Sequence, residues 1–328
     1  MLRLKPTLAI LISSISLSAC AKSEAGLEGY VWQQVTESAS YQQSYNYPVF
    51  VMNGQMLAMN NGAWVSTDGK TWTKTALPDS GLNSGYQKYV QLNDAVYSLG
   101  SISGNYQRFT VSTKILRTRD AKTWETVANQ SNLPQRIFYS TAVFKNRIWL
   151  IGGYDGHNYF NDVWNSEDGV KWQPVLEKAP WSPRQSAAVV LFKNRLWMFG
   201  GGVIDGDKEI NPESYKEVWS SADGINWTKE KLKTERSGGG TPIVFDNKLW
   251  FVGANRNDGS FSNAVTVSDD GVTWQAQSAP WSPRGGVAVW VFDNRLFMTG
   301  GKYSYTEANG EIKFVYSNDV WVMSKKTE

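Results

Sequence analysis

A near-duplication within the chain constrains its fold more than any other feature of the sequence. The stretch APWSPRQSAAVVLFKNRLWMFGG begins at Ala179, and APWSPRGGVAVWVFDNRLFMTGG begins at Ala279. Each copy has an arginine after Ser-Pro, an apolar run, a polar turn, and a second apolar run that ends in Gly-Gly. Internal repetition of this kind is typical of proteins that use one supersecondary unit several times. The chain is therefore expected to fold as an array or ring of similar units.

The unit that begins at Arg136 shows the whole repeat. Its two apolar runs are joined by a turn at residues 144–147, and Asn161-Asp162-Val163-Trp164, a Ser-Glu-Asp-Gly turn and a run from Trp172 follow. Short β-rich runs separated by Asn, Asp and Gly predict four antiparallel strands. Counting back from each hairpin asparagine locates six units, which begin at Gln43, Asn83, Arg136, Arg184, Arg236 and Arg284.

The two ends of the chain complement each other. The sixth unit stops at Asn318-Asp319-Val320-Trp321, one strand short of a full repeat. The missing W-x-x-V run stands near the start of the chain, at Trp32 to Val35. A closed ring in which the N-terminal strand completes the last unit would leave no open sheet edge.

The combination of P-R, F-x-N-R-L-W, G-G and N-D-V-W resembles the kelch β-propeller superfamily. The resemblance implies an all-β fold: a single six-bladed β-propeller of four-stranded blades over residues 30–328, with the last blade closed by the N-terminal strand. The first two units depart from the pattern, because Asn60-Asn61 and Gly100-Ser101 replace Gly-Gly. Turns such as Ser66 to Trp72 also resemble sialidase Asp-boxes shortened by one residue, and we interpret them as structural.

The N-terminus has the pattern of a lipoprotein signal. Basic residues at positions 3 and 5 precede an apolar stretch and then Leu17-Ser18-Ala19-Cys20, which resembles a bacterial lipobox. We expect a signal peptide over residues 1–19, acylation of Cys20, a short linker over 20–29, and anchoring in the bacterial cell envelope. Ala21 after the cysteine favours the outer membrane. Cys20 is the one cysteine of the chain, so no internal disulfide is expected.

The arginines of the repeat are the first candidates for a ligand site. In a propeller the first strand of each blade is innermost, so Arg136, Arg184, Arg236 and Arg284 would meet at one mouth of the central channel and attract anions. The alternative is that each arginine bonds backbone carbonyls or an acidic loop residue of its own blade. Candidates for that acid are Asp155, Asp205, Asp207, Glu209 and Asp258.

Four further residues complete the candidate set. Trp181 and Trp281 precede two of the arginines, where each indole would either stack on a sugar or pack against the next blade. Tyr154 and His157 lie in the loop of the third unit, and His157 is expected at its surface.

Composition limits the chemistry. A single histidine rules out a galactose-oxidase-like copper site with two histidine ligands, and no Cys/His metal constellation or G-x-S-x-G motif occurs. A formal net charge of +3 gives no argument for nucleic acid. We therefore expect a monomer without cofactor or metal that binds an unidentified protein or an anionic glycan. The alternative is a sugar-active enzyme similar to kelch sialic acid mutarotases or to sialidases, and the binding function is favoured over it.

Overall fold

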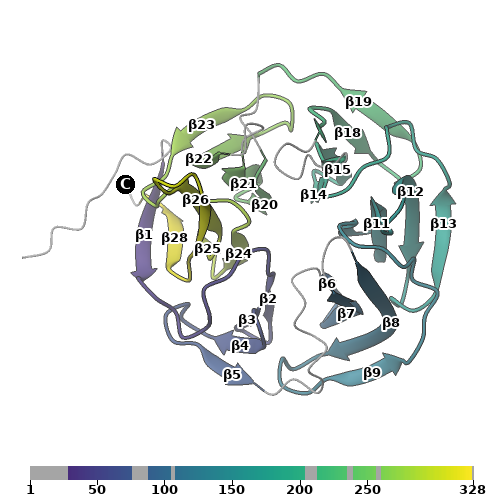
Figure 1. The fold of residues 1–328 in the computed structure, drawn as a ribbon, viewed down its shortest axis with the longest axis horizontal. Coiled ribbons are helices and arrows are strands. Elements are labelled where there is room, and N and C mark those ends of the chain that lie inside the picture. The colour runs from purple at the N-terminus through teal and green to yellow at the C-terminus, as the bar shows by residue number, and fades with distance from the viewer. Residues whose placement is uncertain are drawn as a thin grey trace, which may run out of the picture.

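The computed structural model describes residues 29–75, 88–104, 108–203, 213–234, 239–255 and 260–326. These residues form six four-stranded antiparallel sheets arranged in a ring (Figure 1). The prediction of an all-β, six-bladed propeller is thereby confirmed. In the described ranges no helix is both long and apolar enough to cross a membrane.

The blades are numbered in chain order, each from its inner to its outer strand. Blade 1 contains β2 (Val49–Met52), β3 (Gln55–Met59), β4 (Ala63–Ser66) and β5 (Thr73–Thr75). Blade 2 contains β6 (Lys88–Leu92), β7 (Ala95–Gly104), β8 (Phe109–Thr118) and β9 (Glu125–Ala128). Blade 3 contains β10 (Ser140–Phe144), β11 (Arg147–Tyr154), β12 (Tyr159–Ser166) and β13 (Trp172–Leu176).

Blade 4 contains β14 (Ala188–Phe192), β15 (Arg195–Phe199), β18 (Val218–Ser221) and β19 (Trp227–Glu230). Blade 5 contains β20 (Thr241–Phe245), β21 (Lys248–Asn255), β22 (Phe261–Ser268) and β23 (Gln275–Ser278). Blade 6 contains β24 (Ala288–Phe292), β25 (Arg295–Thr299), β28 (Val320–Lys325) and β1 (Tyr30–Thr36). Two ribbons extend blades 4 and 6: β16 (Gly202–Val203) with β17 (Glu213–Ser214), and β26 (Lys302–Thr306) with β27 (Ile312–Tyr316).

Ring closure by the N-terminal strand is confirmed. Strand β1 pairs antiparallel with β28, with Trp32 opposite Met323. The ring of Trp32 makes an edge contact with Trp281 at 4.5 Å between centroids, and Trp227 of blade 4 meets Trp181 in the same way at 4.9 Å. Trp32 therefore takes the place of a last-strand tryptophan, as the displaced W-x-x-V run predicted.

The core lies between the blades rather than within any one of them. Six clusters of buried side chains fill the six junctions, and tryptophans of the second and last strands contribute large apolar areas to them. At the junction of blades 6 and 1, for example, Trp290 and Phe297 pack with Trp72. No single blade could bury its own apolar faces, so stability depends on the closed ring.

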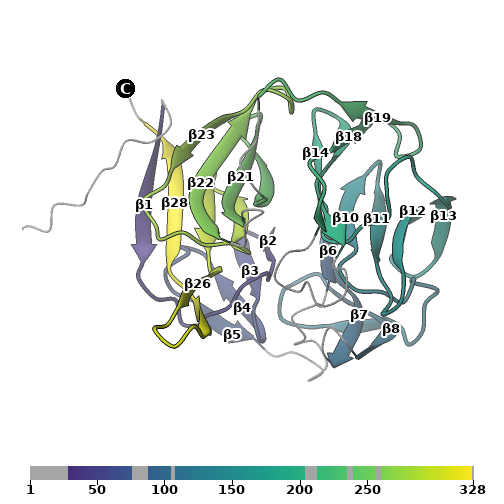
Figure 2. The same cartoon turned by 45° about the horizontal axis from the view of Figure 1, so that its top comes forward.

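The connections between strands define two faces. The turn face carries the strand 1–2 hairpins and the Asp-Gly turns between strands 3 and 4. In one such turn Asp68 accepts backbone hydrogen bonds from Lys70 and Thr71, and these bonds lower the pKa of Asp68. The loop face carries the strand 2–3 connections and the links between blades. In Figure 2 the β26 ribbon on the loop face lies at the opposite end of blade 6 from the C-terminus.

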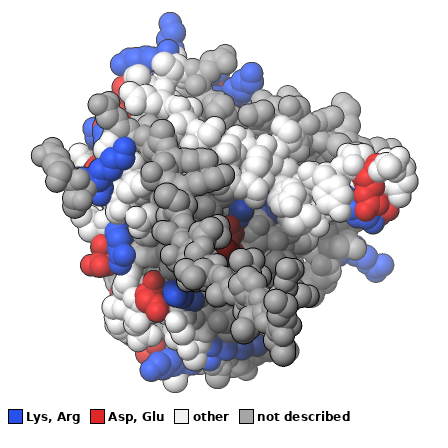
Figure 3. Space-filling model, turned by 90° about the vertical axis from the view of Figure 1, so that its left-hand side faces the viewer, with Lys and Arg blue, Asp and Glu red and all other residues white. Residues whose placement is uncertain are grey.

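On the side of the molecule that carries β1, the described basic and acidic side chains are interspersed (Figure 3). On this side of the molecule they do not gather into a field of one sign.

Candidate functional site

Three of the predicted arginines are buried, and each is bonded within its own blade. Arg136 donates to both carboxylate oxygens of Asp162, at 2.6 and 3.1 Å, and to the carbonyl oxygen of Gly152 at 3.2 Å. Its guanidinium carbon lies 3.8 Å from the ring centroid of Phe160. The side chain of Arg136 is only 6% exposed. This arginine has a partner on each side and little contact with solvent.

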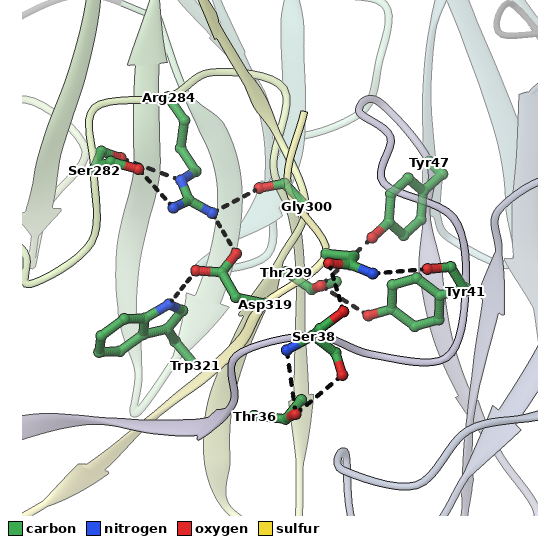
Figure 4. Close-up of polar contacts among 11 residues, drawn as sticks. Thr36, Ser38, Tyr41, Tyr47, Ser282, Arg284, Thr299, Gly300, Asp319 and Trp321 are labelled. Atoms are coloured by element: carbon green, nitrogen blue, oxygen red, sulfur yellow. Dashed lines mark hydrogen bonds and ion pairs between the residues drawn. The ribbon is translucent and has the colours of Figure 1, made fainter. Parts of the chain in front are cut away.

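Arg184 and Arg284 repeat the arrangement. Arg184 donates to Glu217 at 2.7 Å and to the Gly200 carbonyl at 2.9 Å. Arg284 donates to Asp319, to the Gly300 carbonyl at 3.3 Å and to Ser282 (Figure 4). The guanidinium charge of each is therefore neutralised inside its blade.

The acid that pairs with each arginine lies on the third strand of the blade (Asp162) or directly before it (Glu217 and Asp319). In Asn-Asp-Val-Trp the aspartate lies two residues before a tryptophan whose indole N–H donates back to it, at 2.7 Å for Trp164 and 2.8 Å for Trp321. Burial opposes ionisation of Glu217, but hydrogen bonds from Lys229 and Arg184 prevail and lower its pKa to about 2.

Of the loop acids proposed from the sequence, only Asp155 lies in the described residues, and it does not pair with a described arginine. Asp155 instead accepts hydrogen bonds from the backbone N–H groups of His157 and Asn158, at 2.8 and 2.7 Å. The other four candidate acids, Asp205, Asp207, Glu209 and Asp258, lie outside the described residues. So does Arg236, which stays a prediction.

The backbones of Arg184 and Arg284 also join two blades. The N–H of Arg184 donates to Phe160 and its carbonyl accepts from Gly153, both at 2.9 Å and both in the preceding blade. Arg284 is bonded in the same way to Ser262 and Ala254 of blade 5. Arg184 and Arg284 thus bond the preceding blade through their main chain and their own blade through their side chain. We call this arrangement a clamp between blades. This geometry favours the structural alternative, while a role in ligand binding stays a prediction.

The Gly-Gly pairs of the repeat make room for the arginine side chains. A Cβ atom on Gly153 would lie 3.0 Å from Cδ of Arg136, and one on Gly301 would lie 3.1 Å from Cδ of Arg284. The second glycine therefore leaves room for the arginine stem. In blade 1, which has no arginine, Asn60 and Asn61 stand at these positions and bond Gln42 instead.

Counting from the hairpin asparagine is wrong by one residue in blade 1. The carbonyl of Ser44 accepts the N–H of Gly301, as the Arg184 carbonyl accepts that of Gly153, so Ser44 and not Gln43 holds the arginine position. The reason is turn length. Asn53 is the first residue of its two-residue turn, whereas Asn146 is the second.

Both loop tryptophans pack inside the protein. Trp181 and Trp281 are each 3% exposed and contact other indoles, Trp227 and Trp32 respectively. Their burial favours the packing alternative over a sugar platform. The remaining candidates do reach the loop face: Tyr154 stacks on Tyr159 at 4.7 Å, and His157 is exposed.

A different set of residues surrounds the ring axis on the loop face. Asn46, Phe138 and Ser186 have φ of 56°, 55° and 55°, and Gly286 has 67°. Each lies two residues after Ser44, Arg136, Arg184 or Arg284. The N–H of Asn46 donates to Gly286, and that of Ser186 donates to Phe138, each at 2.8 Å. We call Asn46, Phe138, Ser186 and Gly286 the axial ring.

The axial ring stores backbone strain. Positive φ is uncommon for serine and a clear outlier for phenylalanine, and residues held this way cost about 1–3 kcal/mol each and cluster at functional sites. Asn46 and Ser186 are also exposed. Sequence reasoning missed this set, because only Gly286 and Asn46 are residue types that favour positive φ, whereas Phe138 and Ser186 are not.

Lys88 is the second feature that the sequence did not reveal. It begins β6, at the level where Ser140 begins β10 and Thr241 begins β20. The hydroxyls of Ser140 and Thr241 donate to the carbonyl oxygens of Ala187 and Val287, the residues directly before the next inner strands, at 2.5 and 2.7 Å. Lys88 has no carboxylate within ion-pair distance in the described part of the chain, and desolvation lowers its pKa. It is a cation without a carboxylate partner in the described residues, on the innermost strand of blade 2 beside β10 of blade 3.

Across the described ranges, no group of three or more His, Cys, Asp or Glu could hold a metal ion. Asn46, Ser186 and Lys88 offer an amide, a hydroxyl and an ammonium. Such groups bind a ligand by hydrogen bonds and charge.

Comparisons with known proteins agree with the fold. A family model described as the KLHDC2/KLHL20/DRC7 Kelch-repeats domain matches residues 87–301. The chain is similar to a solved structure titled "Structure of YjhT", with a TM-score of 0.65 and 15% identity over 88% of this chain and 96% of that one. At this identity the likeness shows the fold alone. A comparison with curated protein sequences finds no match. Because the family model covers well over half of the chain and coincides with the blades seen here, the protein belongs to the KLHDC2/KLHL20/DRC7 Kelch-repeats domain family.

Proposed function

We propose that this protein is an envelope-anchored binding module that holds an acidic glycan at the loop-face end of its ring axis. The observation that carries the proposal is Lys88, an ammonium group that is partly desolvated and has no carboxylate partner in the described residues. A ligand carboxylate would supply that partner. The three described arginines, by contrast, already have their acids.

The state of Lys88 is costly without a ligand. Burial disfavours the charged form of an amine, and that cost is recovered only when an anion pairs with it. Residues kept in a destabilising state are typical of binding sites, since stability alone would favour an apolar side chain there. Lys88 therefore fits a site for an anion better than a structural role.

The axial ring supplies the neutral contacts of the proposed site. The amide of Asn46 and the hydroxyl of Ser186 are exposed donors and acceptors, as sugar hydroxyls require. The ring of Phe138 offers an apolar surface beside them. Backbone bonds between blades hold these residues at fixed positions, which reduces the entropy lost on binding.

The proposed lipid anchor would leave the loop face accessible to a ligand. Gly29 and Tyr30 lie on the turn face, where the Tyr30 hydroxyl donates to Asp246 and the Lys326 N–H donates to Gly29. An acylated Cys20 would attach the protein to the outer membrane from that side. The loop face, with the axial ring, would then be directed away from the membrane.

The alternative of a sugar-active enzyme requires a group that can exchange a proton near neutral pH. The described arginines of the repeat already hold the carboxylates of Asp162, Glu217 and Asp319. Glu217, with a pKa of about 2, stays ionised and is a poor general acid. Binding is therefore the function that we propose.

The test is calorimetric titration of the mature protein with galacturonic acid and N-acetylneuraminic acid, and with neutral galactose. We expect wild type to bind an acidic sugar more tightly than galactose, and Lys88→Met to lose about 10–150-fold in affinity, since a charge-assisted hydrogen bond contributes roughly 1.5–3 kcal/mol. Lys122→Met is the matched control, because Lys122 is an exposed lysine on the turn face of the same blade. Equal affinity of wild type and Lys88→Met for every sugar would refute the proposal.

A further inference from the structure

A second lysine without a carboxylate partner adjoins the axial ring. Lys302 begins β26, and its backbone exchanges two hydrogen bonds of 2.9 Å with Gly285, the neighbour of Gly286. Its Nζ lies 4.2 Å from the ring centroid of Tyr45, the neighbour of Asn46. The ribbon of β26 and β27 (Figure 2) is therefore bonded to the chain next to the axial ring, at Gly285 and Tyr45.

Aromatic rings flank this lysine. Lys302 lies opposite Tyr316 in the ribbon, and Ser304 lies opposite Phe314, so all four side chains share one face of the ribbon. The Nζ of Lys302 is 4.7 Å from the Phe314 centroid, and the Tyr45 and Tyr316 rings are 5.6 Å apart. No carboxylate of the described residues pairs with Lys302, and desolvation lowers its pKa.

The same ribbon concentrates exposed apolar surface. Five large hydrophobic side chains of the described residues are exposed, and three of them, Tyr305, Ile312 and Phe314, are on β26 and β27. Phe314 is 49% exposed while its ring contacts the lysine. An open aromatic ring beside a cation that has no carboxylate partner in the described residues matches a group that carries both a C–H face and a negative charge. A sugar ring with a carboxylate is such a group.

We infer that the ligand is an acidic polysaccharide rather than a single acidic sugar, and that the β26–β27 ribbon binds a second carboxylate-bearing residue of that chain. This inference rests on the proposed function, since it extends the site at Lys88 to a second subsite at Lys302. A chain of acidic sugars repeats its carboxylate at regular intervals, so one molecule can pair with both ammonium groups. An acidic peptide would repeat the charge but would lack the flat C–H face that suits Phe314.

The test is affinity as a function of ligand length. Galacturonic acid and its oligomers of two to six residues, and sialic acid with its α-2,8-linked oligomers, are titrated into the full mature protein. Linking a second contact raises affinity through effective concentration, so we expect oligomers to bind wild type at least about tenfold more tightly than the monomer. Lys302→Met and Phe314→Ala should abolish this gain and leave binding of the monomer unchanged.

Lys313→Met is the matched control on the same ribbon. Lys313 lies opposite Tyr305 on the other face and is paired with Glu311, so its loss should preserve the gain with length. Thermal unfolding of each variant confirms that the ring is intact.

The outcomes separate the two proposals. If wild type binds monomer and oligomers equally, or Lys302→Met keeps the gain, the inference fails and the proposed function stands. A hexa-glutamate peptide that binds as tightly as the longest oligomer would also overturn the inference. If no acidic sugar of any length binds wild type, the proposed function fails first.

Discussion

Removing one arginine clamp should cost far more stability than removing a surface ion pair. In Arg284→Met, Asp319 loses its ion pair and keeps only the Trp321 indole as a hydrogen-bond donor among the contacts described. The two side chains are 5% and 13% exposed. Breaking a buried pair from one side leaves an uncompensated charge and costs about 3–5 kcal/mol. We expect Arg284→Met to lose an amount in this range.

A second substitution tests the cause. In Arg284→Met with Asp319→Asn the orphaned charge is removed while an amide oxygen still accepts the Trp321 N–H. The double variant should therefore recover more than about 1 kcal/mol relative to Arg284→Met alone. Arg295→Met is the control in the same blade: Arg295 and Asp293 are 42% and 75% exposed, so this loss should stay below about 1 kcal/mol.

Urea unfolding followed by tryptophan fluorescence measures all four proteins. We also expect the double variant to keep its affinity for an acidic sugar, because Arg284 and Asp319 are not among the residues proposed to contact the ligand. Unchanged stability of Arg284→Met, together with lost binding, would show that the arginine serves the ligand and would refute this account of the clamps.

Three further outcomes follow from the structure. The folded-state pKa of Glu217 is lowered to about 2 from 4.5, so the stability that this carboxylate contributes is present above pH 4.5 and is lost as pH falls toward 2. The urea midpoints of wild type and Glu217→Gln should therefore converge over this pH range, and a constant difference between the two midpoints would contradict the prediction. Trp32→Ala should destabilise the ring by about 3–5 kcal/mol and promote aggregation, since Trp32 packs the closing strand against Trp281; a variant that melts like wild type would show that closure does not depend on it. Cys20→Ser should move the protein from the membrane fraction to the soluble fraction, and retention with unchanged lipid labelling would exclude the anchor.

The ring and its closure could be predicted because each blade repeats the same local signals. Asn318 to Trp321 and the run at Trp32 each lack a partner in the linear sequence, and only a closed ring joins them. Trp32 then contacts Trp281, as Trp227 of blade 4 contacts Trp181. Periodic turns and apolar runs depend on short-range chemistry, so they can be read without the structure.

The site could not be predicted to the same degree, because its contacts depend on register across strands. Arg136 and Asp162 are far apart in sequence and meet only when β11 lies between their segments. From the sequence, loop acids were expected to pair with the arginines, but the acid that meets a given arginine does not follow from distance along the chain. Phe138 carries no sequence signal of positive φ. Lys88 lies in blade 2, which departs from the repeat pattern. No motif marks this lysine, and only its place at the start of the innermost strand draws attention to it.

The most direct test of the account is the titration of Lys88 itself, followed by NMR of lysines labelled at Cε and Nζ. The resonance is assigned by its loss in Lys88→Met. In the free protein the pKa of Lys88 should lie below its ordinary value of 10.5, because burial desolvates the ammonium and no carboxylate of the described residues pairs with it. Saturating galacturonic acid should raise that pKa, since a carboxylate stabilises the charged form. A Lys88 that titrates at its ordinary value, and does so equally with and without the acidic sugar, would contradict the proposed site.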